Sequence, residues 1–370
     1  MARASTALLE WLRPGAVRRP SIRPLEAGLR PNSRLDESQT IVTSPELTPD
    51  DVAALGALVF VSSGDAILRL DDAGTTPLAS NLGGRVTAMR VVGSNLVAAV
   101  EGRGLIQVRA DGTATDLSDN ALVLRCVTDI LGLKGAEPSG SGELLIAVGS
   151  TAVDSVSWGQ EFVAKRRSGR LVRVHTDGRA ELVADSLGWP SGLAQGTGEN
   201  ILVSLSMDHR IEERSTTNLG VPGKAVLENL AGYPGRLRER PGGGWWVAMP
   251  YLRNRATELL MSEDEAVADM LKNVVETEWL IPMLRSENVY RDPLQIGQQR
   301  VMGQLKPWAP PRTYGLVFRL GTDGRVVESA HSTPDGHRKG VTGVAPLNDG
   351  TVVVACQGAR AVVSVREMQP

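Results

Sequence analysis

The chain of 370 residues has little of several residue types whose abundance marks a protein class. It has two cysteines, Cys126 and Cys356, too few and too far apart for a disulfide scaffold or a zinc site, so we expect two structural thiols. Its 40 Lys and Arg nearly balance its 42 Asp and Glu, without a long run of one sign, which argues against nucleic acid and membrane surfaces as partners. No apolar run approaches the roughly 18 residues that a membrane span needs.

The N-terminal segment is rich in arginine but has no long apolar stretch. Arginines flank a short apolar segment at 7–11, which is shorter than the apolar region of a secretory signal peptide. A transit peptide has a similar composition, but we favour a solvated arm, residues 1–45, that packs on the outside of the domain. The sequence therefore predicts a cytoplasmic protein.

Glycine, by contrast, is abundant: 40 residues exceed the average of about 7% and favour many tight turns. Short β-rich runs recur, each after a turn that contains Gly, Asn or Asp. These runs lie at 57–61, 96–100, 144–148, 201–205, 245–249 and 352–356. A shorter segment of small residues precedes five of the turns, at 86–89, 126–130, 190–194, 234–237 and 340–344. The pattern predicts repeated pairs of antiparallel strands.

A second kind of hairpin follows several of these pairs. It is built around an Asp-Gly or Ala-Gly turn and occurs at 69–78, 108–117, 174–183 and 319–328. Two hairpins make a four-stranded unit of about 40 to 50 residues, and radial repetition of such units is a β-propeller. The prediction is an all-β fold, a six-bladed β-propeller over residues 46–370. A doubly wound α/β fold would need helices between the strands, and a two-sheet sandwich leaves the small-residue strands unexplained.

The fifth unit carries a long insertion at about 250–313. Its apolar residues follow a rough helical period near Thr257 to Leu271. Trp279, Tyr290 and Trp308 make it the most aromatic part of the chain. We expect it to cover the substrate or to mediate a homo-oligomer contact, while a helix that merely covers blade edges is the alternative.

Three segments resemble one known family. WPSGLAQGTGENILVSLSMDHRI (189–211), YPGRLRERPGGGWWVAMPYLRNR (233–255) and GVTGVAPLNDGTVVVACQG (340–358) are similar to elements of the gluconolactonase/strictosidine synthase-like six-bladed propellers. The similarity runs from about Glu46 to the end of the chain. It implies an active site at the mouth of the central channel, lined by the first strand of every blade. Members of the family include lactonases, phosphotriesterases, arylesterases and Pictet–Spengler synthases.

The resemblance also implies a ligand set that this chain lacks. The family's hydrolases hold calcium or zinc with a Glu of the first blade and Asn or Asp of three others. Here Ser191 stands at an expected Asn, and Gly235 and Arg236 stand at an expected Asp-Asn pair. An arginine in the channel would repel a metal ion, so we expect no metal and no cofactor.

The remaining ligand positions are less well defined. Glu46 or Asp50 falls at the acidic position of the first unit, and Thr128 or Asp129 falls at an expected Asn in the third. The glutamate that alkaloid synthases present from the last blade has no clear counterpart, which argues against Pictet–Spengler chemistry.

Arg236 is the first candidate site residue, and two roles stay open for it. Its guanidinium binds a carboxylate or phosphate or stabilises an oxyanion, or it bridges the channel to Glu46, Asp50 or Asp129. Asp129 is either that partner or a general base, and a neighbouring arginine would depress its pKa. His337, on the loop into the last inner strand, is the best histidine for acid–base work, with a surface loop residue as the alternative.

Other candidates would line the channel. Ser191 lacks a G-x-S-x-G context and is expected to be a small lining residue, and Thr342 of the last inner strand is expected to contact substrate. Trp189 and Tyr233 begin adjacent inner strands and form an apolar pocket wall or pack between blades. His209 is expected to be mainly structural.

The sequence thus predicts a hydrolase for a small ester or lactone, independent of metal, with Arg236 as the electrophilic or anion-binding group. A propeller that binds an anionic metabolite without catalysis and a strictosidine synthase-like synthase or lyase remain alternatives.

Overall fold

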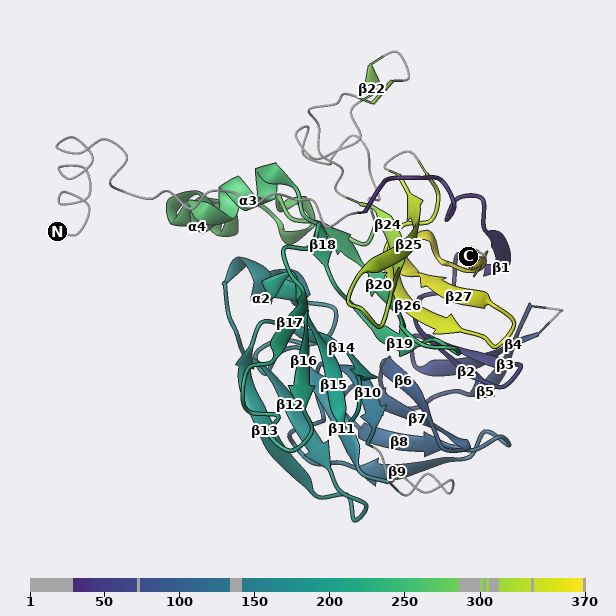
Figure 1. The fold of residues 1–370 in the computed structure, drawn as a ribbon. Coiled ribbons are helices and arrows are strands. Elements are labelled where there is room, and N and C mark those ends of the chain that lie inside the picture. The colour runs from purple at the N-terminus through teal and green to yellow at the C-terminus, as the bar shows by residue number, and fades with distance from the viewer. Residues whose placement is uncertain are drawn as a thin grey trace.

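Four-stranded antiparallel sheets recur six times along the chain, as predicted (Figure 1). The computed structural model describes residues 29–71, 74–133, 142–285, 300–301, 304–305, 313–333 and 336–368. The first strands of neighbouring sheets contact one another in a closed ring, in the order β2, β6, β10, β14, β19, β26 and back to β2. The fold is therefore a six-bladed β-propeller, and these six are its inner strands.

The first three blades follow the chain from inner to outer strand. Blade 1 consists of β2 (Pro49–Leu55), β3 (Leu58–Ser63), β4 (Ala66–Asp71) and β5 (Gly74–Ala79). Blade 2 consists of β6 (Val86–Val92), β7 (Asn95–Val100), β8 (Gly104–Val108) and β9 (Ala114–Ser118). Blade 3 consists of β10 (Val127–Gly132), β11 (Leu144–Val148), β12 (Gly169–Val174) and β13 (Ala180–Leu187).

Blades 4 and 5 repeat this order. Blade 4 consists of β14 (Pro190–Gln195), β15 (Asn200–Leu205), β16 (Arg210–Ser215) and β17 (Lys224–Leu227). Blade 5 consists of β19 (Leu237–Glu239), β20 (Trp245–Met249), β24 (Gly315–Leu320) and β25 (Val326–Ser332). The predicted insertion therefore lies between β20 and β24, within blade 5.

Blade 6 joins the two ends of the chain. Its strands β26 (Val341–Pro346), β27 (Thr351–Cys356) and β28 (Ala361–Arg366) are completed by β1 (Gln39–Thr43), which pairs antiparallel with β28. Part of the segment expected as an arm thus serves as the outer strand of the last blade. Pairing the first strand with the last closes the ring, because neither end of the propeller is then free to separate.

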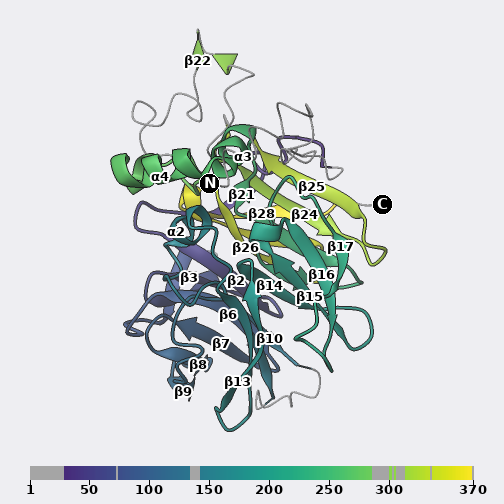
Figure 2. The ribbon, with the colours of Figure 1, turned by 90° about the vertical axis from the view of Figure 1, so that its left-hand side faces the viewer.

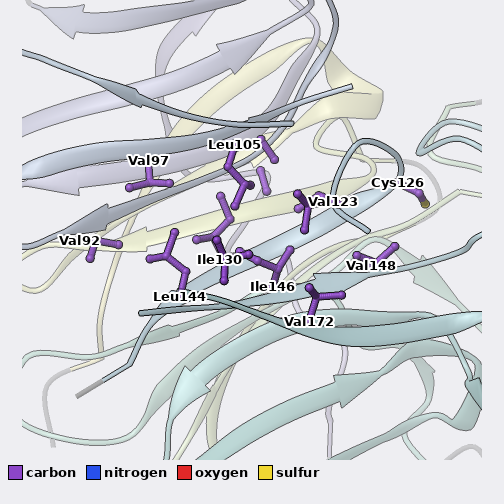
Figure 3. Packing of buried hydrophobic residues seen from close by; sticks show 14 of the residues in the cluster. Val92, Val97, Leu105, Val123, Cys126, Ile130, Leu144, Ile146, Val148 and Val172 are labelled. Carbon is purple, nitrogen blue, oxygen red and sulfur yellow. The ribbon is translucent and has the colours of Figure 1, made fainter. Parts of the chain in front are cut away.

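The second strand of every blade is buried over most of its length, and β11 and β20 are buried throughout. Each such strand is covered on both faces by neighbouring blades, so it reads as a continuous apolar run rather than an alternating one. Figure 3 shows one of the resulting cores, a single cluster to which blade 2 contributes Val97 and Leu105 and blade 3 contributes Ile130, Ile146 and Val172. The two cysteines are free and buried.

Two helical segments lie over one side of the propeller (Figure 2). The connection between β11 and β12 contains α2 (Trp158–Val163), and the blade 5 insertion contains α3 (Arg255–Ser262) and α4 (Asp264–Asn273). Asn254 caps α3, because its Oδ1 accepts the N–H of Thr257 at 2.8 Å. The helices that were expected near 257–271 are confirmed, whereas Tyr290 and Trp308 lie outside the described residues.

The insertion and α2 form one continuous cover, which we call the roof. Val163 of α2 packs in a buried cluster with Val267, Met270, Trp279 and Ile281 of the insertion. The remaining short elements are β18 (Gly232–Tyr233) paired with β21 (Tyr251–Leu252), β22 (Arg300–Val301) paired with β23 (Gln304–Leu305), and the 3₁₀ turns η1 (Ser206–Asp208), η2 (Glu276–Glu278) and η3 (Gln357–Ala359). Among the described residues, no helix is both long and apolar enough to cross a membrane.

Candidate functional site

Five of the six inner strands are irregular near their first residues. The pairing register shifts in β2, β6, β10, β14 and β26. The residues that fall within these shifts are Asp50 and Asp51, Thr87, Thr128, Ser191 and Thr342. A residue in a β-bulge leaves the hydrogen-bond ladder, which frees its carbonyl oxygen to point elsewhere. The bulges therefore supply polar groups to the channel.

The Arg236 side chain, which directly precedes β19, engages four of these bulges. Its Nε donates to the carbonyl of Thr128 at 3.1 Å, and its Nη1 donates to the carbonyls of Thr342 at 2.7 Å and Asp50 at 2.9 Å. Its Nη2 donates to the carbonyl of Thr87. One guanidinium thus ties together the inner strands of blades 1, 2, 3 and 6 from blade 5.

Two carboxylates complete the surroundings of Arg236. Nη1 lies 3.2 Å from Oδ1 of Asp50, and Nε lies 3.2 Å from Oδ2 of Asp51. Burial by itself would lower the pKa of Arg236, but the carboxylates of Asp51 and Asp50 outweigh it and leave that pKa above its ordinary value. Arg236 is therefore a permanent buried cation. It bridges the inner strands and also forms the floor of a cavity.

Blade 4 approaches the same segment through a close backbone contact. A Cβ atom on Gly192 of β14 would lie 2.4 Å from the carbonyl oxygen of Gly235 and 2.8 Å from the Cα of Arg236. Only glycine allows this separation, so the seat of Arg236 depends on Gly192 as well as on its own hydrogen bonds.

A second arginine lies one level deeper. Arg238 projects from β19 on the same side as Arg236, because side chains two residues apart share one face of a strand. Its Nη1 contacts Asp129 at 2.9 and 3.1 Å, and its Nη2 contacts Asp51 at 2.9 and 3.1 Å. Asp51 also accepts the N–H of Met89, and Asp129 accepts that of Leu193, each at 2.8 Å. These buried pairs lock blades 1 to 5 together.

Asp129 is fully buried in this layer. Burial raises its pKa, and the guanidiniums of Arg238 and Arg90 oppose the rise without cancelling it. The depressed pKa expected for a carboxylate beside an arginine is therefore wrong. A third pair lies beyond, where Arg90 binds both carboxylate oxygens of Glu239 at 2.8 and 2.7 Å.

A pocket of about 310 Å³ opens above Arg236. Four aromatic residues line it: Trp158, Trp189, Tyr233 and Tyr251. Trp158 of α2 stacks on Tyr251 with ring centroids 4.2 Å apart and meets Tyr233 edge-on at 5.6 Å. The pocket therefore has aromatic walls on the side of the roof and a charged floor, an arrangement typical of sites for small organic molecules.

The polar groups at the floor centre on Asp50. Its carboxylate is held by Arg236 and lies 3.8 Å from Nε of Arg85, and its side chain is 16% exposed. Arg85 also lines the pocket. Its buried Nε has no hydrogen-bond partner within the described part of the chain. A buried donor in this state costs free energy unless a ligand or water satisfies it.

Ser191 and Ser206 form a pair at the pocket wall. Their Oγ atoms are 2.5 Å apart, and Oγ of Ser206 donates to the carbonyl of Pro234 at 2.6 Å. The hydroxyl of Ser206 therefore donates its hydrogen bond to Pro234. The hydroxyl of Ser191 donates to Oγ of Ser206 or, at 3.4 Å, to the carbonyl of Trp189. Neither a serine hydroxyl nor a backbone carbonyl serves as a general base, so these contacts do not activate Ser191 as a nucleophile.

The structure brings together six of the nine residues predicted for the site. Asp50, Trp189, Ser191, Tyr233, Arg236 and Thr342 line the pocket. Asp129 lies beneath it under Arg238. Glu46 is exposed and its N–H binds Oγ of Ser44, while His337 is exposed on its loop and its N–H donates to Asp36 at 2.7 Å. Glu46 and His337 do not contribute to the pocket lining.

His209 lies behind the pocket rather than in it. Its ring meets Tyr233 edge-on at 4.7 Å, and its Nδ1 lies 3.1 Å from the carbonyl of Gly232. Burial is the main reason why its pKa falls to about 4. A neutral imidazole packed against Tyr233 is consistent with the structural role expected for this residue.

Sequence reasoning missed Arg85, Arg238, Asp51, Trp158 and Tyr251. Arg238 could have been found, because alternation along a strand places it on the same face as Arg236. Trp158 had no such signal, because it reaches the pocket from a connection outside the repeated strands.

The family resemblance raised the question of a metal ion. In the described ranges no group of three or more His, Cys, Asp or Glu side chains is placed to hold one. The carbonyl and carboxylate oxygens that surround the channel are already bound to the Arg236 guanidinium. Since a divalent cation beside this group would meet a buried positive charge, the residues present do not fit a metal.

No protein-family model and no curated protein matches the chain by sequence. Solved structures match its fold. Regucalcin, a calcium-binding protein from Agrobacterium tumefaciens, is 13% identical with a TM-score of 0.54, over 89% of this chain and 92% of that one. A gluconolactonase from Xanthomonas campestris is 13% identical with a TM-score of 0.53, over 93% and 99%. A luciferin-regenerating enzyme is 11% identical with a TM-score of 0.51, over 91% and 94%. The chain shares their six-bladed architecture.

Proposed function

We propose that the pocket above Arg236 binds a small neutral ester or lactone and hydrolyses it. The observation that carries this proposal is the pairing of two groups on the floor of an aromatic pocket. Asp50 offers a carboxylate fixed by Arg236, and Nε of Arg85 offers an N–H without a hydrogen-bond partner among the described residues. A base and an oxyanion donor side by side are what addition of water to a carbonyl requires.

The charge balance of the floor favours a neutral substrate. Three carboxylates, Asp50, Asp51 and Asp129, are matched by three guanidiniums, Arg85, Arg236 and Arg238. An anion would enter a site without net positive charge and would approach Asp50, whereas a neutral carbonyl avoids that repulsion. The aromatic walls add apolar contact area for such a molecule.

In the proposed reaction, Asp50 takes a proton from a water molecule as the water oxygen adds to the carbonyl carbon. The carbonyl oxygen becomes an oxyanion that accepts the N–H of Arg85 Nε. The carbon–oxygen bond to the leaving alkoxide then breaks, and the proton passes from Asp50 to that alkoxide. Arg236 acts through Asp50, because its donors are directed at protein oxygens and fix the carboxylate. The gluconolactonase among the structural neighbours supports a lactone as one substrate class.

The test compares Asp50→Asn with the wild type on activated esters and lactones such as p-nitrophenyl acetate and dihydrocoumarin. We expect kcat/KM to fall about 100-fold or more, since general base catalysis contributes 10²–10⁴-fold. Glu199→Gln is the control, because Glu199 is an exposed carboxylate in the turn between β14 and β15. Wild-type protein that turns over none of these substrates, or an Asp50→Asn variant with full activity, would refute the proposal.

The N–H on Nε of Arg85, which makes no hydrogen bond within the described residues, also favours a second candidate, binding of an anionic metabolite without catalysis. That function predicts a carboxylate ligand that raises the Tm of the wild type but not of Arg85→Gln, with no product formed. Hydrolysis predicts the opposite pattern: turnover of neutral esters and little stabilisation by carboxylates.

A further inference from the structure

The outer surface of the roof presents apolar side chains to solvent. Leu259 of α3 is 58% exposed, and Leu271 and Val275, in and just after α4, are 44% and 62% exposed. Ala268 and Leu271 are three residues apart in α4, which places them on one side of the helix, and Val274 and Val275 follow directly after its end. We call these residues, together with Leu259, the roof face.

This stripe is distinct from the one that holds α4 in place. Val267 and Met270 are buried in the cluster with Trp279 and Val163. The helix therefore already has a face that packs on the molecule, and the roof face is a second apolar surface. Large apolar side chains exposed in one segment of the chain are typical of interaction sites.

The roof face is set in an acidic surrounding. Residues 255–279 contain seven acidic and two basic residues, a net charge of −5. The chain as a whole has a net charge of −2, so this one segment is far more acidic than the rest. A partner for the roof face should combine apolar side chains with positive charge.

Residues 1–28 of the same chain have this composition. They carry five arginines against two glutamates, a net charge of +3. Leu8, Trp11 and Leu12 are spaced by three and four residues, the spacing by which a helix presents one apolar face. Apolar anchors with this spacing are how an amphipathic segment binds a groove or helix face.

The point at which the described chain begins makes this contact feasible. Leu29 packs against the hydrophobic cluster shared by blades 4 and 5, and blade 5 is the blade that carries the insertion. Twenty-eight extended residues span up to about 90 Å, so residues 1–28 can reach any part of the roof. Because the link is covalent, the segment meets the roof face at a high effective concentration.

We propose that residues 1–28 dock on the roof face, with Leu8, Trp11 and Leu12 against its apolar side chains and the arginines against its acidic residues. The docked segment stabilises the roof. Through the packing of α4 on α2, it holds Trp158 over the pocket. The inference is independent of the chemistry proposed for the pocket.

The test uses the full chain and measures hydrogen–deuterium exchange. In Leu8→Ser/Trp11→Ser/Leu12→Ser, amides of α4 should exchange about tenfold faster than in the wild type, while those of β7 and β11 should not change. Leu58→Ser, at a residue of blade 1 that is 45% exposed, is the control and should leave α4 unchanged. A synthetic peptide of residues 1–24, added to the triple variant, should restore slow exchange in α4, and 1 M NaCl should weaken that rescue.

Two results would overturn the proposal. One is equal exchange of α4 in the triple variant and the wild type. The other is slow exchange that depends on protein concentration and accompanies a doubled mass, which would assign the roof face to a second copy of the chain.

Discussion

Replacing Arg238 by methionine tests the idea that buried ion pairs hold the inner strands together. The substitution keeps an unbranched side chain but removes the guanidinium between Asp51 and Asp129, both of which are completely buried. Four N–H···O contacts to these carboxylates, at 2.9 to 3.1 Å, are lost at once, together with those to the carbonyls of Leu237 and Met89. Two carboxylates then remain in the interior without this partner.

Breaking a buried ion pair by removing one member costs about 3–5 kcal/mol, because the remaining charge stays desolvated. We therefore expect Arg238→Met to lower the free energy of unfolding by about 4 kcal/mol, roughly a 1,000-fold change in the folding equilibrium. Arg103→Met is the control: Arg103 pairs with Asp116, whose side chain is 62% exposed. Loss of such a surface pair costs about 1 kcal/mol or less.

Urea unfolding followed by tryptophan fluorescence measures both variants. A further variant, Asp51→Asn/Asp129→Asn/Arg238→Met, separates charge from packing. It removes both negative charges and keeps amide oxygens for the N–H groups of Met89 and Leu193. It should recover about half of the loss or more. A loss below 1 kcal/mol for Arg238→Met, or a triple variant no more stable than the single one, would refute this reasoning.

Two further predictions concern the channel cation and a buried histidine. Arg236→Ala leaves carbonyl oxygens and two carboxylates facing one cavity, so the Tm of the variant should be lower than that of the wild type. Addition of Ca²⁺ should raise the Tm of the variant and leave the wild-type Tm unchanged. A variant whose Tm does not respond to calcium would contradict the idea that these oxygens surround the guanidinium. Burial lowers the pKa of His331 from 6.5 to about 4, so the unfolded chain binds a proton that the folded chain rejects as pH falls from 6.5 towards 4. His331 should therefore lower the free energy of unfolding by about 2 kcal/mol as the pH falls from 7 to 5. Urea denaturation of His331→Gln at pH 7 and pH 5 should show a loss smaller by this amount. An equal loss in the variant and the wild type would refute the prediction.

Much of the fold follows from local sequence. The apolar runs at 96–100, 144–148 and 352–356 are second strands buried on both faces, and the Gly-containing turns before them set antiparallel pairing. Because every blade repeats the same local code, the number of blades and the place of the insertion are readable from the chain. The closure by β1 was less visible, since Gln39 to Thr43 is a short and largely exposed strand.

The contacts of the candidate site depend much less on local sequence. The resemblance to a known family placed Arg236 at the channel and left Glu46 and Asp50 as alternatives for the acidic position of the first blade. It could not show that Arg236 donates to Thr87, Thr128 and Thr342, because the direction of those carbonyls depends on bulges that form only when the strands pair.

The sequence by itself determined the six-bladed architecture, the channel and the arginine at its mouth, since repeats and alternation are local properties of a chain. Only the tertiary structure decided which groups meet there. It placed Trp158 and Arg85 in the pocket, Asp129 beneath Arg238, and His337 on an exposed loop. The physical reason is that a site at the centre of a propeller is assembled from residues far apart in sequence, whose side chains and carbonyls converge only when the ring closes.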